Sequence, residues 1–217
     1  MSAPSSPSWR SGSRSAAAVG VRLLAVSDEV EPQLVDERTV ATQGRIDLLI
    51  GCGDLPPDYL DLLSAVYSAP LLFVRGNHDP PGRQGDYPAA AEIDGRIVRE
   101  QGLLIAGLEG SIRYSEGAHQ YTERQMMAKV LALRVRLGTR GLDILITHGP
   151  PAGVNEGTDA PHRGLKAVRR AVEWMRPRLL LHGHVHPYGR EIVREAQLGE
   201  TRVVNVVGHR VIEIATP

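Results

Sequence analysis

The sequence predicts a layered α/β fold, and three observations favour this class. Five short apolar runs are hydrophobic without alternation, which is typical of strands buried on both faces. Segments with helical spacing of apolar residues lie between several of these runs, as expected for helices that pack outside the sheets. The chain has 217 residues, 42% of them hydrophobic, and can therefore bury one substantial core in a single domain.

The N-terminal residues are expected to stay outside that domain. They are rich in Ser, Pro, Ala and Arg and lack the apolar stretch of a secretory signal. We therefore interpret residues 1–20 as a disordered tail and residues 21–217 as the folded domain. An amphipathic targeting presequence without acidic residues is the alternative, which Pro4 and Pro7 disfavour.

Each of the five apolar runs is expected to form a strand, and each ends abruptly in polar residues. In chain order they are "VRLLAVSD" (21–28), "IDLLIGCGD" (46–54), "PLLFVRGNHD" (70–79), "LDILITHGPP" (142–151) and "RPRLLLHGHVH" (176–186). Further strands, joined by Gly-containing turns, are expected within residues 95–110, 188–195 and 200–214.

Three helices are expected between the strands. The longest is predicted to begin at "YTERQ", where Thr122 and Gln125 have the spacing of a capping box, and to end at Gly138. The other two depend on apolar residues at helical spacing. These are Leu60, Leu63, Val66 and Tyr67 after the second strand, and Leu165, Val168, Val172 and Met175 after the fourth.

Composition and charge exclude several classes of protein. The 25 basic residues balance 25 acidic ones, so no general attraction for nucleic acid or anionic lipid is expected. The apolar runs are far shorter than the roughly 18 to 20 residues of a membrane-spanning helix. Cys52 is the only cysteine, which excludes an internal disulfide and a thiolate zinc site. We expect a cytoplasmic enzyme without a membrane partner, and its oligomeric state stays open.

Polar residues with metal-binding chemistry follow all five strands. In open α/β sheets, ligands lie beyond the carboxyl ends of the strands, where successive loops converge. The residues at these ends are Asp28, Asp54, Asn77, His78, Asp79, His148, His182, His184 and His186. Carboxylate, carboxamide and imidazole groups together suit Mn, Fe or Zn ions. Their convergence favours a metal site over a set of unrelated buried or capped histidines.

The ends of the second to fifth apolar runs, "GCGD", "GNHD", "THGPP" and "HGHVH", resemble the motifs of the calcineurin-like metallophosphoesterases, and they follow one another in the same order. The resemblance spans residues 28–186. It implies a four-layer αββα sandwich of two mixed β-sheets flanked by helices, with a metal site at the C-terminal strand ends. The implied activity is hydrolysis of a small phosphomonoester or phosphodiester by attack of metal-bound hydroxide.

The resemblance also implies which residues bind the metal. Asp54 is similar to the carboxylate that bridges two ions. Asn77, His148 and His184 would complete one site with it, and Asp28 and His186 would complete the other. One or two divalent cations are expected as cofactors, with Mn, Fe or Zn favoured and Mg allowed.

His78 resembles the family's histidine that assists departure of the alcohol group. It would act as a general acid or by stabilising charge, and Asp79 would fix the orientation of its ring. The alternative is that His78 only closes the turn after the third strand.

One motif departs from the family pattern, which has Asp, any residue and His where this chain has Asp28, Glu29 and Val30. Valine cannot bind a metal, so the Asp28 site lacks a ligand unless Glu29 or a loop residue reaches in. Three interpretations remain open: a weakened second metal with water in the gap, a single-metal enzyme, or a non-catalytic module that binds metal or phosphate and acts through a protein partner. The stretch "SDEV" also resembles a subgroup of the family whose first motif reads Ser, Asp, a variable residue and Val.

Residues outside the motifs could bind the substrate. Arg113 and Arg163 lie in Gly-containing loops, where a guanidinium could clamp a phosphate group, and His162 could line the mouth of the pocket. Solvation at the surface or a structural ion pair is the alternative for both arginines. His182 has no ligand role in the family pattern, so we expect it to form a hydrogen bond at a strand end.

Overall fold

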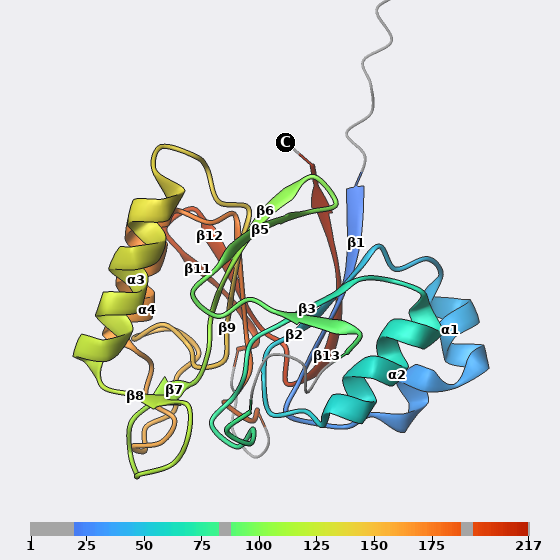
Figure 1. Ribbon diagram of the computed structural model, residues 1–217, viewed down its shortest axis with the longest axis horizontal. Coiled ribbons are helices and arrows are strands. Elements are labelled where there is room, and N and C mark those ends of the chain that lie inside the picture. Colours follow the sequence, from blue (N-terminus) through green and yellow to red (C-terminus); the bar gives the residue numbers. More distant parts are fainter. Residues whose placement is uncertain (1–19, 83–87, 188–192, 217) are drawn as a thin grey trace, which may run out of the picture.

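Two β-sheets stacked face to face form the centre of the protein, as Figure 1 shows for the computed structural model. The structure describes residues 20–82, 88–187 and 193–216. Gly20, the last residue of the expected tail, is the first residue of a strand, and the rest of that tail lies outside the described ranges. Most of the strand expected at 188–195 also lies outside them.

Among the described residues, the first sheet has five strands in the order β13-β1-β2-β3-β4. Its members are β1 (Gly20–Ser27), β2 (Leu48–Gly51), β3 (Leu71–Phe73), β4 (Ala90–Glu92) and β13 (Gly208–Ala215). Strands β1 to β4 run parallel, whereas β13 is antiparallel to β1 along its whole length. The carboxyl ends of β1, β2 and β3 therefore lie at the same edge of this sheet.

The second sheet has six strands within the ranges that the structure describes, in the order β11-β12-β10-β9-β6-β5. Its members are β5 (Ile97–Glu100), β6 (Leu103–Leu108), β9 (Ile144–Thr147), β10 (Leu179–His182), β11 (Glu195–Leu198) and β12 (Thr201–Asn205). The four central strands run parallel, and each edge strand is antiparallel to its neighbour. The region 200–214 thus supplies one strand to each sheet, because β12 belongs to the second sheet and β13 to the first.

In the described part of the chain, four α-helices cover the outer faces of the two sheets (Figure 1). They are α1 (Glu37–Gln43), α2 (Pro57–Tyr67), α3 (Glu123–Leu137) and α4 (Lys166–Met175). The last three were predicted. Helix α1 and a 3-10 helix at Pro32–Val35 were not. Helix α1 buries none of its residues, so it has no apolar face for a sequence pattern to reveal.

The predicted start and end of α3 are confirmed. The Thr122 side chain accepts a hydrogen bond from the backbone N–H of Gln125, and the two residues form a capping box. The helix ends at Gly138, which has a φ of 64°. At 15 residues α3 is the longest described helix, and in the part of the chain that the structure describes no helix has the length and hydrophobicity needed to cross a membrane.

Alternate residues of each strand pack into different layers of the core. In β1, Ala25 faces the space between the sheets, whereas Val26 packs toward α1 and α2. In β9, Ile146 faces the other sheet and Leu145 packs against α3 and α4. Burial on both faces explains why these strands are continuously apolar. The predicted four-layer αββα sandwich of two mixed sheets is thereby confirmed.

Candidate metal centre

Side chains from both sheets converge where the parallel strands end. Asp54 follows β2, and its Oδ2 lies 3.2 Å from Nε2 of His148, which follows β9. The same imidazole nitrogen lies 3.0 Å from Oδ1 of Asn77, beyond β3. One ligand atom from each of Asp54, His148 and His184 lies within 4.8 Å of the others. The structure therefore brings together the four residues predicted for one metal site.

The backbone turns sharply at three of the predicted ligands. Asp28, Asp54 and His184 have φ values of 65°, 56° and 69°, in the left-handed region that costs non-glycine residues about 1–3 kcal/mol each. Such strain persists only where the surrounding structure imposes it, and it is common at functional sites. The conformation turns each side chain off its strand end and into the shared site.

Two motif glycines allow the strand ends to approach each other closely. A Cβ atom on Gly53 would lie 2.6 Å from Nδ1 of His148, and a Cβ atom on Gly76 would overlap the carboxylate of Asp54. The glycines of "GCGD" and "GNHD" therefore provide the space in which the ligands pack.

His148 and Asp54 form a buried pair of coupled charges. His148 is fully buried, and its Nδ1 donates to the carbonyl of Cys52 at 2.8 Å. Burial alone would lower the pKa of His148, but the hydrogen bond and negative charge of Asp54 raise it to about 9. Burial alone would raise the pKa of Asp54, but His148 and the His78 backbone N–H, at 2.8 Å, lower it to about 2.

His184 reaches the same cluster as a neutral imidazole. Burial and the charge of His148 lower its pKa to about 3. Its Nε2 donates to the carbonyl of Pro161 at 2.8 Å, which leaves Nδ1 as the nitrogen with a lone pair. The rings of His148 and His184 have centroids 4.8 Å apart.

Asp28 and His186, the residues expected to complete the other metal site, lie close to each other and line the same pocket. Asp28 Oδ2 accepts hydrogen bonds from the Ser27 hydroxyl and, at 2.9 Å, from the backbone N–H of His184. Its Oδ1 lies 3.7 Å from Nε2 of His186. Oε1 of Glu29 lies 3.3 Å from Nδ1 of the same ring.

Asp79 has different contacts from those expected. We predicted that it orients the ring of His78, but its Oδ2 accepts the backbone N–H groups of Gly76, at 2.7 Å, and Asp54, at 3.0 Å. Burial raises the pKa of this carboxyl group. The contacts found for Asp79 among the described residues thus hold the backbone around Asp54. The role of Asp79 in orienting the His78 ring stays a prediction.

The predicted residues open onto a pocket of about 480 Å³. Its lining consists of Asp28, Asp54, His78, Tyr114, Pro161, His162, His184 and His186. His162 thus lies where the sequence predicted, and its Nδ1 donates to Asp159 at 2.6 Å. Asn77 and His148 are buried next to this pocket.

The two predicted arginines do not line this pocket. Arg113 is directed elsewhere, with Nη2 3.4 Å from the carbonyl of Gln120, and Arg163 is exposed. Instead Tyr114, the neighbour of Arg113, lines the pocket, and its hydroxyl oxygen accepts a hydrogen bond from Asn77 Nδ2 at 3.1 Å. The sequence carried no signal for Tyr114, because it belongs to no motif and its position depends on the fold of its loop.

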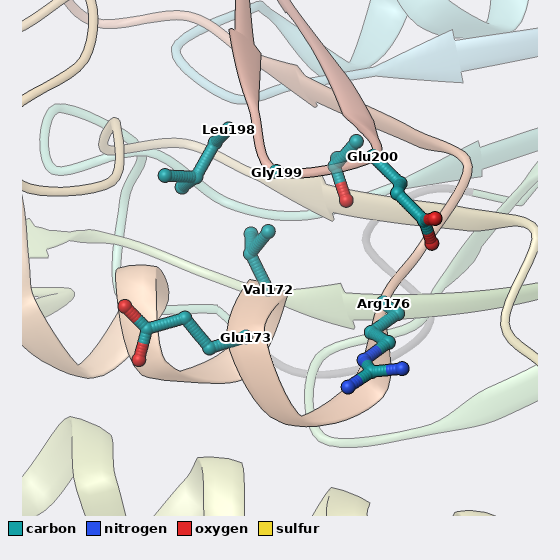
Figure 2. A pocket seen from close by; sticks show the side chains of 7 residues that line it. Val172, Glu173, Arg176, Leu198, Gly199 and Glu200 are labelled. Carbon is teal, nitrogen blue, oxygen red and sulfur yellow. The ribbon is translucent and has the colours of Figure 1, made fainter.

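A second pocket, shown in Figure 2, lies away from these residues. It is bounded by the end of α4 and the turn between β11 and β12, with Val172 and Leu198 as apolar walls and Arg176 and Glu200 beside them. None of the predicted site residues lines it.

His182 is not among the clustered ligand residues. It is buried, its Nδ1 lies 2.9 Å from the Gly183 carbonyl, and burial lowers its pKa to about 4.

The residues of the cluster fit a divalent cation. Two imidazoles, a carboxylate and a carboxamide oxygen form the mixed donor set that Mn, Fe and Zn accept. Backbone carbonyls occupy Nδ1 of His148 and Nε2 of His184, so the opposite ring nitrogens would be the ligand atoms, and a cation would displace the proton that Nε2 of His148 shares with Asp54.

Comparison with known proteins agrees with this geometry. The family model described as the calcineurin-like phosphoesterase superfamily domain matches residues 22–208. Among solved structures, the protein TT1561 of Thermus thermophilus is similar, with a TM-score of 0.66 and 16% identity over 92% of this chain and 100% of that one. GAP50 of Plasmodium has a TM-score of 0.51 and 11% identity, covering 90% of this chain and 81% of its own. At these identities the likeness shows the fold alone, and no curated protein matches the sequence.

Proposed function

Because the chain belongs to the calcineurin-like phosphoesterase superfamily, we propose that it is a metal-dependent hydrolase of a small phosphomonoester or phosphodiester. The observation that carries this proposal is the cluster of Asp54, Asn77, His148 and His184 beside a pocket that His78 also lines. A structural metal site would need neither the pocket nor the additional histidine.

The ligand residues would hold one or two divalent cations, with Mn, Fe or Zn favoured. When bound, such cations lower the pKa of water at the site and neutralise charge on phosphoryl oxygens. By its place in the family motif, Asp54 would be the carboxylate shared by both positions; its Oδ2 lies 3.2 Å from His148 Nε2, and its Oδ1 accepts the His78 backbone N–H.

His78 would assist departure of the alcohol. Its side chain is exposed in the pocket, and its backbone N–H is anchored to Asp54 at 2.8 Å. A ring held there can donate a proton to the leaving oxygen or stabilise its charge. In this role His78 contacts the substrate without binding the metal.

The proposal is tested by metal content together with hydrolysis of an aryl phosphate and an aryl phosphodiester. We expect Asp54→Asn to lose both bound metal and turnover, because it removes the carboxylate shared by the ligands. His78→Ala should keep the metal and lose about 100-fold or more in turnover, the usual contribution of general acid catalysis. Asp58→Asn, on the exposed first turn of α2, is the control and should change neither. Purified protein that takes up no divalent metal would contradict the proposal.

The second candidate function is a module that binds metal or phosphate and acts through a protein partner. Val30, in the place of a family ligand, is the observation that favours it. This candidate would be rejected if the protein hydrolyses either aryl ester and His78→Ala loses that turnover while it retains its metal.

We further propose that residues 21–217 act as one domain in a reducing, cytoplasmic compartment, with Cys52 as a buried free thiol.

A further inference from the structure

The incomplete half of the metal centre contains a carboxylate that the family motifs do not explain. Glu29 Oε1 lies 3.3 Å from Nδ1 of His186, and Nε2 of the same ring lies 3.7 Å from Asp28 Oδ1. The imidazole of His186 therefore lies between two carboxylates, with one carboxylate near each ring nitrogen.

The ring of His186 is more exposed than the rings of the other two histidines at the centre. Its side chain is 45% exposed, whereas His148 and His184 are buried and donate to backbone carbonyls. A carboxylate beside Nδ1 favours the proton on that nitrogen, which leaves the lone pair of Nε2 directed toward Asp28. Glu29 is thus placed to give His186 the orientation that carbonyl groups give the buried histidines.

We propose that Glu29 is a positioning residue that holds His186 in the orientation needed for a second divalent cation, which His186, Asp28 and Asp54 would hold together. This inference rests on the proposed function. Nε2 and Asp28 Oδ1, 3.7 Å apart, can both reach one ion, because metal–ligand bonds to these atoms are about 2.0–2.2 Å long. Glu29 would thereby compensate for the histidine that is absent at Val30, a residue that is 49% exposed and does not line the pocket.

Glu31 provides a matched control on the same segment. Its carboxylate lies 2.9 Å and 3.0 Å from Nδ1 of His209, and it does not line the pocket. The two glutamates that flank Val30 therefore have different histidine partners, and only Glu29 faces a predicted metal ligand.

The test is a titration of metal-free protein with Mn²⁺, followed by calorimetry and by electron paramagnetic resonance. We expect the natural sequence to bind two ions per chain, with the coupled spectrum of two neighbouring Mn²⁺ ions. His186→Ala should bind one. Glu29→Ala should bind the first ion normally and the second about 10–100-fold more weakly, the usual cost of losing a residue that orients a ligand. Glu29→Gln, which keeps an acceptor oxygen, should bind the second ion with an affinity between those of the natural sequence and Glu29→Ala. Glu31→Gln should bind both ions like the natural sequence.

The outcomes separate this inference from the proposed function. Unchanged affinity for the second ion in Glu29→Ala would overturn the inference, as would a natural protein that binds only one ion. In both cases the proposed hydrolase survives. Failure to bind any ion would overturn the proposed function itself. Normal binding of the first ion shows that a variant is folded. If Glu29→Ala does not bind the first ion normally, the affinity of Glu29→Gln for the second ion is compared with that of the natural protein instead.

Discussion

Tyr114 is held next to the candidate ligand Asn77 by the residues around it. Its backbone N–H, like that of Ser115, donates to Oε1 of the buried Gln120. Its hydroxyl oxygen accepts a hydrogen bond from Asn77, so the hydroxyl hydrogen is not used there. No acceptor for that hydrogen is found among the described residues. A phosphoryl oxygen in the pocket would be a suitable acceptor.

Tyr114→Phe is therefore expected to raise KM for an aryl phosphate about 2–10-fold with metal content unchanged. The expected range follows from a neutral hydrogen bond of roughly 0.5–1.5 kcal/mol. Arg113→Ala is the control, because this side chain does not line the pocket, and its KM should equal that of the natural enzyme. An unchanged KM in Tyr114→Phe would show that the hydroxyl does not contact the substrate.

At the scale of elements, the short strands β7 (Ser111–Ile112) and β8 (Gln120–Tyr121) are held by a partly buried charged network. Glu109 accepts from the Tyr121 hydroxyl and lies 3.2 Å from His119 Nδ1 and 3.4 Å from Lys129 Nζ. Burial alone would raise the pKa of Glu109, but His119, Lys129 and Tyr121 lower it to about 2.

The same network connects the β7–β8 pair to the turn that contains Asp79 and Pro80, beside the pocket. Nε2 of His119 lies 3.3 Å from the carbonyl of Pro80, which directly follows Asp79. The loop that carries Tyr114 lies between β7 and β8, so the position of Tyr114 depends on contacts made well outside the metal centre.

The pH dependence of this network can be measured. The hydrogen bond to Glu109 raises the pKa of His119, so its stabilising contribution is fully present below the unfolded value of about 6.5 and is lost as pH rises through the higher folded value. We expect His119→Ala to lower the free energy of unfolding by about 1 kcal/mol more at pH 6 than at pH 10. Urea unfolding of both proteins at both pH values tests this, and an equal loss at the two values would contradict it.

At the scale of the whole molecule, the candidate ligands are divided between the two sheets. Asp54 and Asn77 follow strands of the five-stranded sheet, and His148 and His184 follow strands of the six-stranded sheet. A cation held by all four would therefore link the two halves of the sandwich. Since the unfolded chain cannot assemble this set, binding should stabilise the folded state.

We expect removal of metal with a chelator to lower Tm by about 5–10 °C. A ligand at 100 times its Kd contributes about 2.7 kcal/mol, and 1 kcal/mol shifts Tm by about 2–4 °C for a domain of this size. Asp54→Asn should have a low Tm that no longer responds to chelator, whereas Asp58→Asn should respond like the natural protein. Thermal unfolding followed by circular dichroism provides the measurement. A Tm that is insensitive to chelator in the natural protein would contradict the link between the sheets.

Much of the fold could be predicted because its signals are local. The capping box at Thr122 depends on residues three positions apart, and the strands buried on both faces need only a short apolar run. Helix α1 gave no such signal, since it buries no residue. The division of residues 200–214 between two sheets was also beyond prediction, because strand pairing is decided by partners far away in the chain.

By itself, the sequence determined which donor atoms stand at the strand ends, because each donor directly follows its apolar run. The tertiary structure alone decided which of them meet. It directs Glu29 to His186 but Glu31 to His209, and it turns Tyr114 rather than Arg113 into the pocket. The physical reason is that these contacts join segments from opposite sheets or from loops whose course depends on packing, and residue spacing along one strand carries no information about them.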